Sequence, residues 1–239
     1  SRDWSSDVCS SDLTMHIVCE VLGMALPGSA PVAALSKKMF DDARAAGERI
    51  VQMVWDDVKP RDILSPGAFA NAVRAVLAIG GSLNAVKHLQ AVATEAQCAV
   101  DVYGLFEALG PQTPVLAGVR PIGERTIEEF EAAGGCRALM KQLLPLLDAQ
   151  ARTVTGGSVA DNLRAYEVRD AEVIRPVGRP VAPRPAIILL SGSLAPEGGL
   201  IKTGIVERKL RRFSGPAIRS EEHTSELQSR LHLVCRLLL

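Results

Sequence analysis

The sequence lacks an excess of either charge. Its 239 residues include 27 basic and 27 acidic side chains, so the formal net charge is zero. A surface dedicated to nucleic acid is strongly basic, because its affinity comes from contacts to phosphates. The balance therefore argues against a nucleic-acid partner. Long apolar runs are absent too: charge or proline interrupts each one before the roughly 18 residues of a membrane span, so we expect no membrane segment.

Cysteines are few and show no paired spacing. Five are present, and no two of them form a C-x-x-C pair. Cys9 and Cys235 lie in the terminal segments at residues 1–13 and 218–239, and the other three are widely spaced, at Cys19, Cys98 and Cys136. A sparse, odd set offers no disulfide framework and is typical of a reducing compartment. The sequence therefore predicts a cytoplasmic location.

Two pairs of residues have metal-ligand chemistry but no third ligand nearby. His16 and Cys19 are three residues apart, on one face of a predicted helix. They fit either half of a metal site or two core residues, and we expect the second because two ligands do not complete a site. Asp56 and Asp57 could bind magnesium, whereas an acidic pair at a solvated helix end is the interpretation we favour.

Both ends of the sequence are interpreted as non-native. Residues 219–229 can be back-translated into a DNA string whose reverse complement, read one base later, encodes residues 3–13 without a mismatch. That string resembles a common sequencing-library adapter. We therefore exclude residues 1–13 and 218–239 from fold reasoning and expect the genuine protein to be an open fragment over residues 14–217. The excluded ends carry four of the 27 basic and six of the 27 acidic residues, so the remainder stays balanced.

Hydrophobic periodicity and cap signals predict a mainly helical part followed by a β-rich part. Residues 14–170 carry the helical patterns, and residues 171–217 hold a proline-rich crossover with short apolar strands. The predicted helices are at residues 14–26, 34–58, 68–79, 84–96, 102–109, 127–133, 136–147 and 158–166. The predicted strands are at residues 114–119, 187–190 and 200–203. No internal repeat is evident.

A glycine corner joins two of these helices. Gly80 and Gly81 separate two alanine-rich segments and are followed by Ser82 and Asn84. Glycine tolerates the positive φ of a helix C-terminus, and Ser or Asn accepts hydrogen bonds from the first N–H groups of the next helix. We predict a helix end, a tight turn and a capped helix start. Such a helix start can hold a carboxylate or phosphate; a corner without a ligand is the alternative.

Five phrases along the chain carry a family resemblance. They occur in the expected order and cover the whole of the region taken as genuine. They are residues 80–89, 128–135, 153–163, 173–176 and 192–198. Together they resemble the middle of the dihydroxy-acid dehydratase and phosphogluconate dehydratase family. Residues 48–60 also resemble its sugar-acid branch.

The resemblance implies a hydro-lyase that removes water from a 2,3-dihydroxy acid to give a 2-keto acid, as in branched-chain amino acid biosynthesis. An iron–sulfur cluster with Mg²⁺ would act as Lewis acid, and a serine alkoxide would take the proton at C2. The implied fold is α/β: an α/β N-terminal domain, of which residues 14–170 are a part, and a β-barrel-like C-terminal domain begun by residues 171–217. The implied partners are a small dihydroxy acid and a second subunit of a homodimer.

The functional residues of the family do not carry over onto this chain. Its cluster cysteines, magnesium aspartates and carbamylated lysine precede Thr14, while its late magnesium glutamate and base serine follow Ala217. The sequence thus predicts no catalytic and no metal-binding residue here. We expect Gly80, Gly81, Ser82 and Asn84 to form part of a substrate-pocket wall.

Two departures from the family pattern bear on the substrate. Leu83 stands where the family usually has Thr, and Ser193 stands where it usually has Asn. We expect the chain to be inactive as it stands and to bind neither the cluster nor Mg²⁺. The alternatives are a fragment of a sugar-acid (aldonate or phosphogluconate) dehydratase, and a non-catalytic helical module for binding or assembly.

Overall fold

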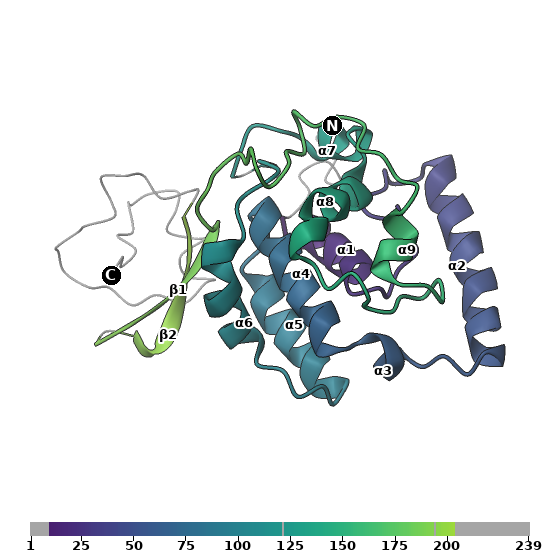
Figure 1. Cartoon of the computed structure of the whole chain (residues 1–239), viewed down its shortest axis with the longest axis horizontal. Helices are drawn as coiled ribbons and strands as arrows, with labels where there is room; N and C mark the ends of the chain where they lie inside the picture. Colours follow the sequence, from purple (N-terminus) through teal and green to yellow (C-terminus); the bar gives the residue numbers. More distant parts are fainter. Residues whose placement is uncertain (1–9, 121, 194, 204–239) are drawn as a thin grey trace.

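A computed structural model describes residues 10–120, 122–193 and 195–203. Predictions for residues 1–9 and 204–239 lie outside this part; these residues include most of the two segments interpreted as non-native and the end of the predicted β-rich part. The elements run as follows (Figure 1): α1 Ser10–Val21, α2 Lys37–Trp55, α3 Pro60–Ile63, α4 Pro66–Ile79, α5 Asn84–Glu95, α6 Val102–Leu109, η1 Gly110–Gln112, α7 Ile127–Ala132, α8 Gly135–Leu143, η2 Leu144–Leu146, α9 Val159–Leu163, β1 Ile187–Gly192 and β2 Ala195–Lys202.

Helix α4 is the central element of the helical body. It packs against α1, α5, α6 and α8, and a helix that is apolar all round is a buried one. Its start is capped by Ser65, whose Oγ accepts the N–H of Ala68 at 3.3 Å, with Pro66 at the first position. Its one buried amide, Asn71, exchanges two hydrogen bonds with the backbone of Asp148, at 2.9 and 2.7 Å. The predicted helix 68–79 is confirmed.

Two of the three core clusters in the described residues share α4, and the third joins Met53, Ile63 and Val154. Ala75, Ala78 and Ile79 of α4 join one cluster with α1 and α8. Phe69 and Val73 of α4 join the other, which holds α5, α6 and the start of β1. Helix α1 also contributes to both clusters through different faces, because its apolar residues recur on several sides. These faces of α1 are buried.

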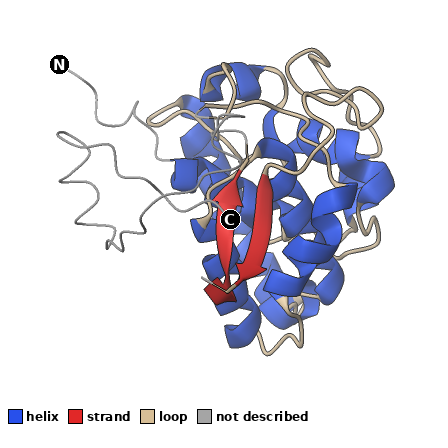
Figure 2. Cartoon of the chain, turned by 90° about the vertical axis from the view of Figure 1, so that its left-hand side faces the viewer, coloured by secondary structure: helices blue, strands red, loops and turns tan. Residues whose placement is uncertain are grey.

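Strands β1 and β2 form an antiparallel hairpin, drawn in red in Figure 2, and β1 packs against α6. The register pairs Ile187 with Lys202 and Leu190 with Gly199, with an irregularity before Gly192. Ile187 is buried against the helices. The two predicted strands are therefore confirmed, and they pair with each other. Within the described residues they form the one sheet, of two strands.

The predicted strand at residues 114–119 is wrong. Val115 makes an isolated bridge to Ala182, and the N–H groups of Leu116 and Ala117 both donate to the carbonyl of Ala78 at the end of α4. The segment is apolar and contains β-branched residues, and this pattern led to the strand prediction. It pairs with a helix end and a loop instead of a second strand, so no ladder forms.

Four predicted helices end three or more residues earlier than expected, at Val21, Trp55, Leu143 and Leu163, and two of these ends have a clear local cause. The helix predicted to run to residue 26, before Pro27, stops at Val21 because Gly23 adopts a φ of 79°. A Cβ at Gly23 would lie 2.7 Å from the carbonyl oxygen of Arg152, so close packing with a distant loop requires this glycine. The helix predicted at residues 136–147 passes into a 3₁₀ turn at Leu144, where Pro145 removes an N–H donor.

Helix α7 begins with a reciprocal cap that offers a test of local stability. Thr126 Oγ1 accepts the N–H of Glu129 at 3.2 Å, and Glu129 Oε2 accepts the N–H of Thr126 at 2.8 Å. Replacing Thr126 with alanine is expected to lower the free energy of unfolding by about 1 kcal/mol. Thr94→Ala, at an exposed site in α5, is the matched control and should change it by less than about 0.5 kcal/mol. Urea titration followed by circular dichroism measures the free energy of unfolding of both variants. Equal losses would contradict the role of Thr126 as a helix cap.

Candidate functional site

The glycine corner begins where α4 ends. Gly80 has a φ of 60° and a ψ of 47°, which is the left-handed conformation predicted for a helix end. Its N–H donates to the carbonyl oxygen of Leu77 at 3.2 Å. The N–H of Gly81 donates to the carbonyl oxygen of Val76 at 2.8 Å. A Cβ at Gly80 would lie 2.1 Å from Ile122 Cδ1. The loop that contains Ile122 thus covers the corner and leaves no room for a side chain.

The next residues tie the corner to α1. The N–H of Ser82 donates to Thr14 Oγ1 at 2.9 Å, and both residues are buried. A Cβ at Gly81 would approach Thr14 Cγ2 to 2.8 Å. Ser82 Oγ in turn accepts the N–H of Asn84 at 3.2 Å. The predicted turn is confirmed; the N-cap position of α5 is Leu83, which makes no side-chain cap, and Ser82 meets the first N–H of the helix from one residue earlier.

Of the four predicted pocket residues, three are buried in this corner. Gly80, Gly81 and Ser82 are buried, whereas Asn84 is exposed on the first turn of α5. All four backbone N–H groups donate to atoms of the chain itself. An anion at this helix start would have to displace those bonds. The geometry therefore favours the helix–helix corner over the anion site, and the role as a pocket wall stays a prediction.

A polar hollow of about 590 Å³ lies beside the loop that covers the corner. It is lined by Arg120, Gly123, Glu124, Arg125 and Glu129. The loop is held by backbone hydrogen bonds between its two sides, for example from the N–H of Arg125 to Gly118 O at 3.1 Å. The Thr126 N–H and the Arg125 guanidinium lower the pKa of the Glu129 carboxyl. The hollow is therefore an exposed charged surface.

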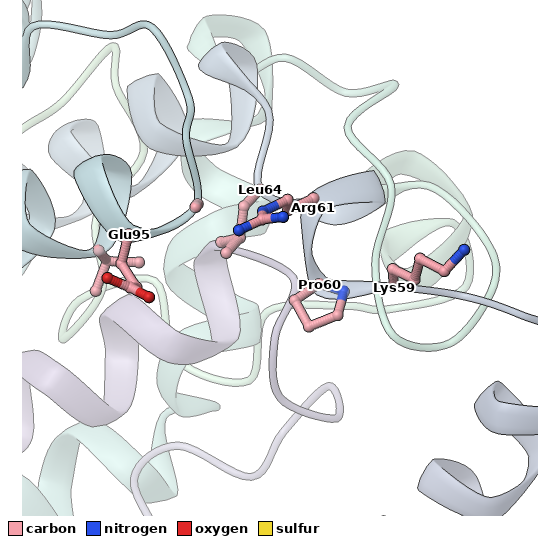
Figure 3. A pocket seen from close by; sticks show the side chains of 7 residues that line it. Lys59, Pro60, Arg61, Leu64 and Glu95 are labelled. Carbon is pink, nitrogen blue, oxygen red and sulfur yellow. The ribbon is translucent and has the colours of Figure 1, made fainter.

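A second hollow, of about 490 Å³, lies at the opposite end of α5. Figure 3 shows Glu95 on one side of it and Arg61 with Leu64 on the other, while Lys59 points away from Glu95. The twelve residues of α5 separate this hollow from the glycine corner by about 18 Å at the usual helical rise. The second hollow and the corner therefore do not form one site.

The described residues do not supply the donor set of an iron–sulfur or magnesium site. Cys19 is exposed, Cys98 is half-buried, and Cys136 is buried with its Sγ donating to Ile17 O at 3.8 Å. Burial raises the pKa of the Cys136 thiol, which disfavours the thiolate that a cluster needs. In residues 10–120, 122–193 and 195–203, no three His, Cys, Asp or Glu side chains are placed to hold a metal ion.

The expectation that His16 and Cys19 are core residues is wrong. Both are exposed, because α1 turns its other faces toward the two core clusters. Asp56 and Asp57 are exposed at the end of α2, where Asp57 pairs with Lys59 at 3.0 Å. These two aspartates therefore have the arrangement expected of a solvated helix end.

Sequence reasoning missed a buried carboxyl in α1. Glu20 is 4% exposed, and its two oxygens accept the N–H groups of Gly28 at 2.8 Å and Ala30 at 2.9 Å. Burial raises the pKa of Glu20 to about 7, against the opposing effects of those N–H groups, Arg137 and Lys38. The available signal was a glutamate that follows the apolar residues Ile17 and Val18 and precedes Val21 and Leu22. The carboxyl holds the loop after α1 in place.

A polar network organises the phrase at residues 153–163. Asn162 accepts from Thr155 Oγ1 at 2.8 Å and donates to Thr153 Oγ1 at 2.9 Å. The N–H of Val154 donates to Gly23 O at 2.7 Å, which joins this loop to the end of α1. The polar side chains of this phrase therefore satisfy one another, and their role in this chain is structural.

The comparison with known families defines the class of protein. The sequence profile described as "Dihydroxy-acid/6-phosphogluconate dehydratase N-terminal" matches residues 10–162, and its C-terminal counterpart matches residues 172–232. The chain therefore belongs to the dihydroxy-acid/6-phosphogluconate dehydratase family. The C-terminal match ends inside residues 218–239, so the boundary drawn at residue 217 stays a prediction.

Individual relatives carry the name dihydroxy-acid dehydratase. The chain is 37% identical to the Caldicellulosiruptor bescii protein over 206 residues, which are 85% of this chain and 37% of the relative. It is 38% identical to the Methanococcoides burtonii protein over 225 residues, covering 89% of this chain and 39% of the relative. It is 39% identical to "Dihydroxy-acid dehydratase 2" of Acinetobacter baylyi over 208 residues, covering 85% of this chain and 36% of the relative. The chain thus spans less than half the length of these relatives.

A membrane-spanning helix must be long and apolar. Within the described residues, none of the helices combines the length and the apolar character needed to cross a bilayer.

Proposed function

We propose that this chain is part of a hydro-lyase that converts a 2,3-dihydroxy acid into a 2-keto acid and water. The observation that carries the proposal is the order of the two family matches, at residues 10–162 and 172–232. Relatives named dihydroxy-acid dehydratase support a substrate of branched-chain amino acid biosynthesis over a sugar acid. A cytoplasmic location, a homodimer, and a β-barrel-like domain begun by β1 and β2 belong to the same proposal.

The described residues contribute a scaffold in this proposal. The glycine corner and the loop over it bring α1, α4 and α5 together, and the corner forms part of a substrate-pocket wall. The donor set described above does not fit an iron–sulfur cluster or Mg²⁺, so those groups would be held by residues of a longer protein. No chemical step is assigned to this chain, and we propose that it is inactive alone.

The alternative substrate is a sugar acid. The description of the matching family includes 6-phosphogluconate, and residues 48–60 resemble that branch. The branches differ in the acid they dehydrate, so the protein encoded by a longer reading frame should be assayed with a branched 2,3-dihydroxy acid and with an aldonate. Turnover of the branched acid alone supports the proposal, and turnover of the aldonate alone replaces it with the alternative.

The chain itself is expected to show neither a cluster nor activity. After anaerobic incubation with iron, sulfide and Mg²⁺, we expect no visible cluster absorbance and no 2-keto acid from either substrate. The full-length Caldicellulosiruptor bescii relative, treated in parallel, is the positive control. Cluster absorbance, or turnover of either acid, by the 239-residue chain would contradict this expectation. A cooperative thermal transition of soluble, inactive chain would favour the helical module.

A further inference from the structure

The second hollow has an apolar floor. It lies where the end of α3 approaches the last turns of α5, and Leu64, Val92 and Ala96 line it. Leu64 is buried, and the other two are half-buried. All three side chains pack in the core cluster that contains α4 and α5, so the floor is a fixed part of the fold. The volume of about 490 Å³ is ample for a small molecule.

Two opposite charges lie on either side of this floor. Arg61 belongs to α3, and Glu95 is the last residue of α5. Both side chains line the hollow, and both residues are exposed. Figure 3 shows Glu95 on one side and the Arg61 guanidinium extending toward it from the other. The hollow therefore has a cationic side, an apolar floor and an anionic side.

These two charges are unpaired within the described part of the chain. The other charged groups near α3 are already engaged, because Lys59 pairs with Asp57 at 3.0 Å and Asp62 accepts the N–H of Lys59 at 2.8 Å. Arg61 and Glu95 make no hydrogen bond or ion pair with a described residue, and they do not pair with each other. The space between them is thus open to a ligand that satisfies both.

A ligand that matches this arrangement carries a carboxylate, an ammonium and an aliphatic group. The planar guanidinium of Arg61 donates two parallel hydrogen bonds to a carboxylate. The Glu95 carboxylate accepts hydrogen bonds from an ammonium. An aliphatic group laid on the floor removes apolar surface from water. The smallest molecule with all three groups is an α-amino acid with an aliphatic side chain.

The two charges also exclude simpler ligands. A carboxylate without an ammonium would be attracted by Arg61 but repelled by Glu95, and an amine without a carboxylate would meet the opposite combination. An amino acid without a side chain would leave the floor exposed to water. Electrostatic complementarity therefore selects a zwitterion, and the floor selects one that is aliphatic.

We propose that the second hollow binds an α-amino acid with an aliphatic side chain, held by Arg61 at its carboxylate and by Glu95 at its ammonium. The site lies at the opposite end of α5 from the glycine corner. The proposal does not depend on the proposed reaction, because no substrate or catalytic group takes part in it.

Titration of the 239-residue chain with L-leucine, followed by ¹H–¹⁵N NMR spectra, tests the site. We expect saturable shifts centred on residues 59–64 and 92–96, with a dissociation constant on the order of 1 mM. Three analogues each lack one group: 4-methylpentanoate has no ammonium, 3-methylbutylamine has no carboxylate, and glycine has no side chain. Each is expected to bind roughly fivefold more weakly or worse.

Substitutions test the two charges separately. Arg61→Gln and Glu95→Gln are each expected to weaken leucine binding roughly fivefold or more. Arg44→Gln and Glu48→Gln are the matched controls, because both residues are exposed on α2 and do not line the hollow. The controls should bind leucine as the wild type does. Since all four positions are exposed, circular dichroism should show unchanged helix content.

Three results overturn the proposal. Absence of saturable leucine binding below about 20 mM would show that the hollow is only a solvated surface. Equal affinity for leucine and 4-methylpentanoate would show that no ammonium is recognised. Leucine binding that is unchanged in both Arg61→Gln and Glu95→Gln would place the ligand elsewhere on the chain.

Discussion

Replacing Gly80 with valine is expected to lower the free energy of unfolding by about 3–5 kcal/mol. At a φ of 60°, a side chain that branches at Cβ is strained against its own backbone. The added Cβ would also lie 2.1 Å from Ile122 Cδ1 and 3.1 Å from Ala186 Cβ. The backbone cannot move away freely, because Gly81 packs against Thr14 on its other side.

Gly178→Val is the control for this substitution. A Cβ at Gly178 meets nothing within 4 Å, and the residue lies in an exposed loop. Its stability should change by no more than about 0.5 kcal/mol. Urea unfolding followed by circular dichroism measures both variants, and Gly80→Ala should fall between them. Equal losses at Gly80 and Gly178 would show that the corner is not closely packed.

The stability of the chain is expected to fall as the pH rises through neutrality, because of Glu20. The folded carboxyl has a pKa of about 7, raised by burial from an ordinary 4.5. The folded state therefore binds this proton more tightly than the unfolded state does. The resulting stabilisation, about 3 kcal/mol, is fully present below pH 4.5 and is lost as the pH rises past 7.

Comparison with Glu20→Gln isolates this effect from other titrating groups. Glutamine does not titrate at this site. The difference in unfolding free energy between the variant and the wild type should therefore change with pH between 4.5 and 7. Glu95→Gln, at an exposed position in α5, should run parallel to the wild type. A wild-type and Glu20→Gln pair with the same pH dependence would show that the buried carboxyl does not titrate in this range.

The family and most helices could be predicted from the sequence because they depend on local order. The helix after Ser65 and Pro66 follows from a cap and a first-turn proline, and the corner at Gly80 follows from the need for a positive φ. The five family phrases are likewise read directly from residue order. None of these features depends on which distant residues approach.

The environment of individual side chains could not be predicted in the same way. Glu20 becomes a buried loop-holding carboxyl because residues 28–30 fold back onto α1. His16 and Cys19 are exposed because the core forms on the other faces of that helix. The candidate site shows the same limit: its residues were identified, whereas the hydrogen bond from Ser82 to Thr14 joins residues 68 positions apart.

The sequence by itself determined the helix starts set by caps, the helix end at Gly80, the hairpin strands and the family. Only the tertiary structure decided that residues 114–119 form no strand, because their N–H groups meet the end of α4 instead of another strand. It also decided which apolar face of α2 packs on the body and which stays exposed. Periodicity defines the faces of a helix, but burial depends on the long-range packing of elements that lie far apart in the chain.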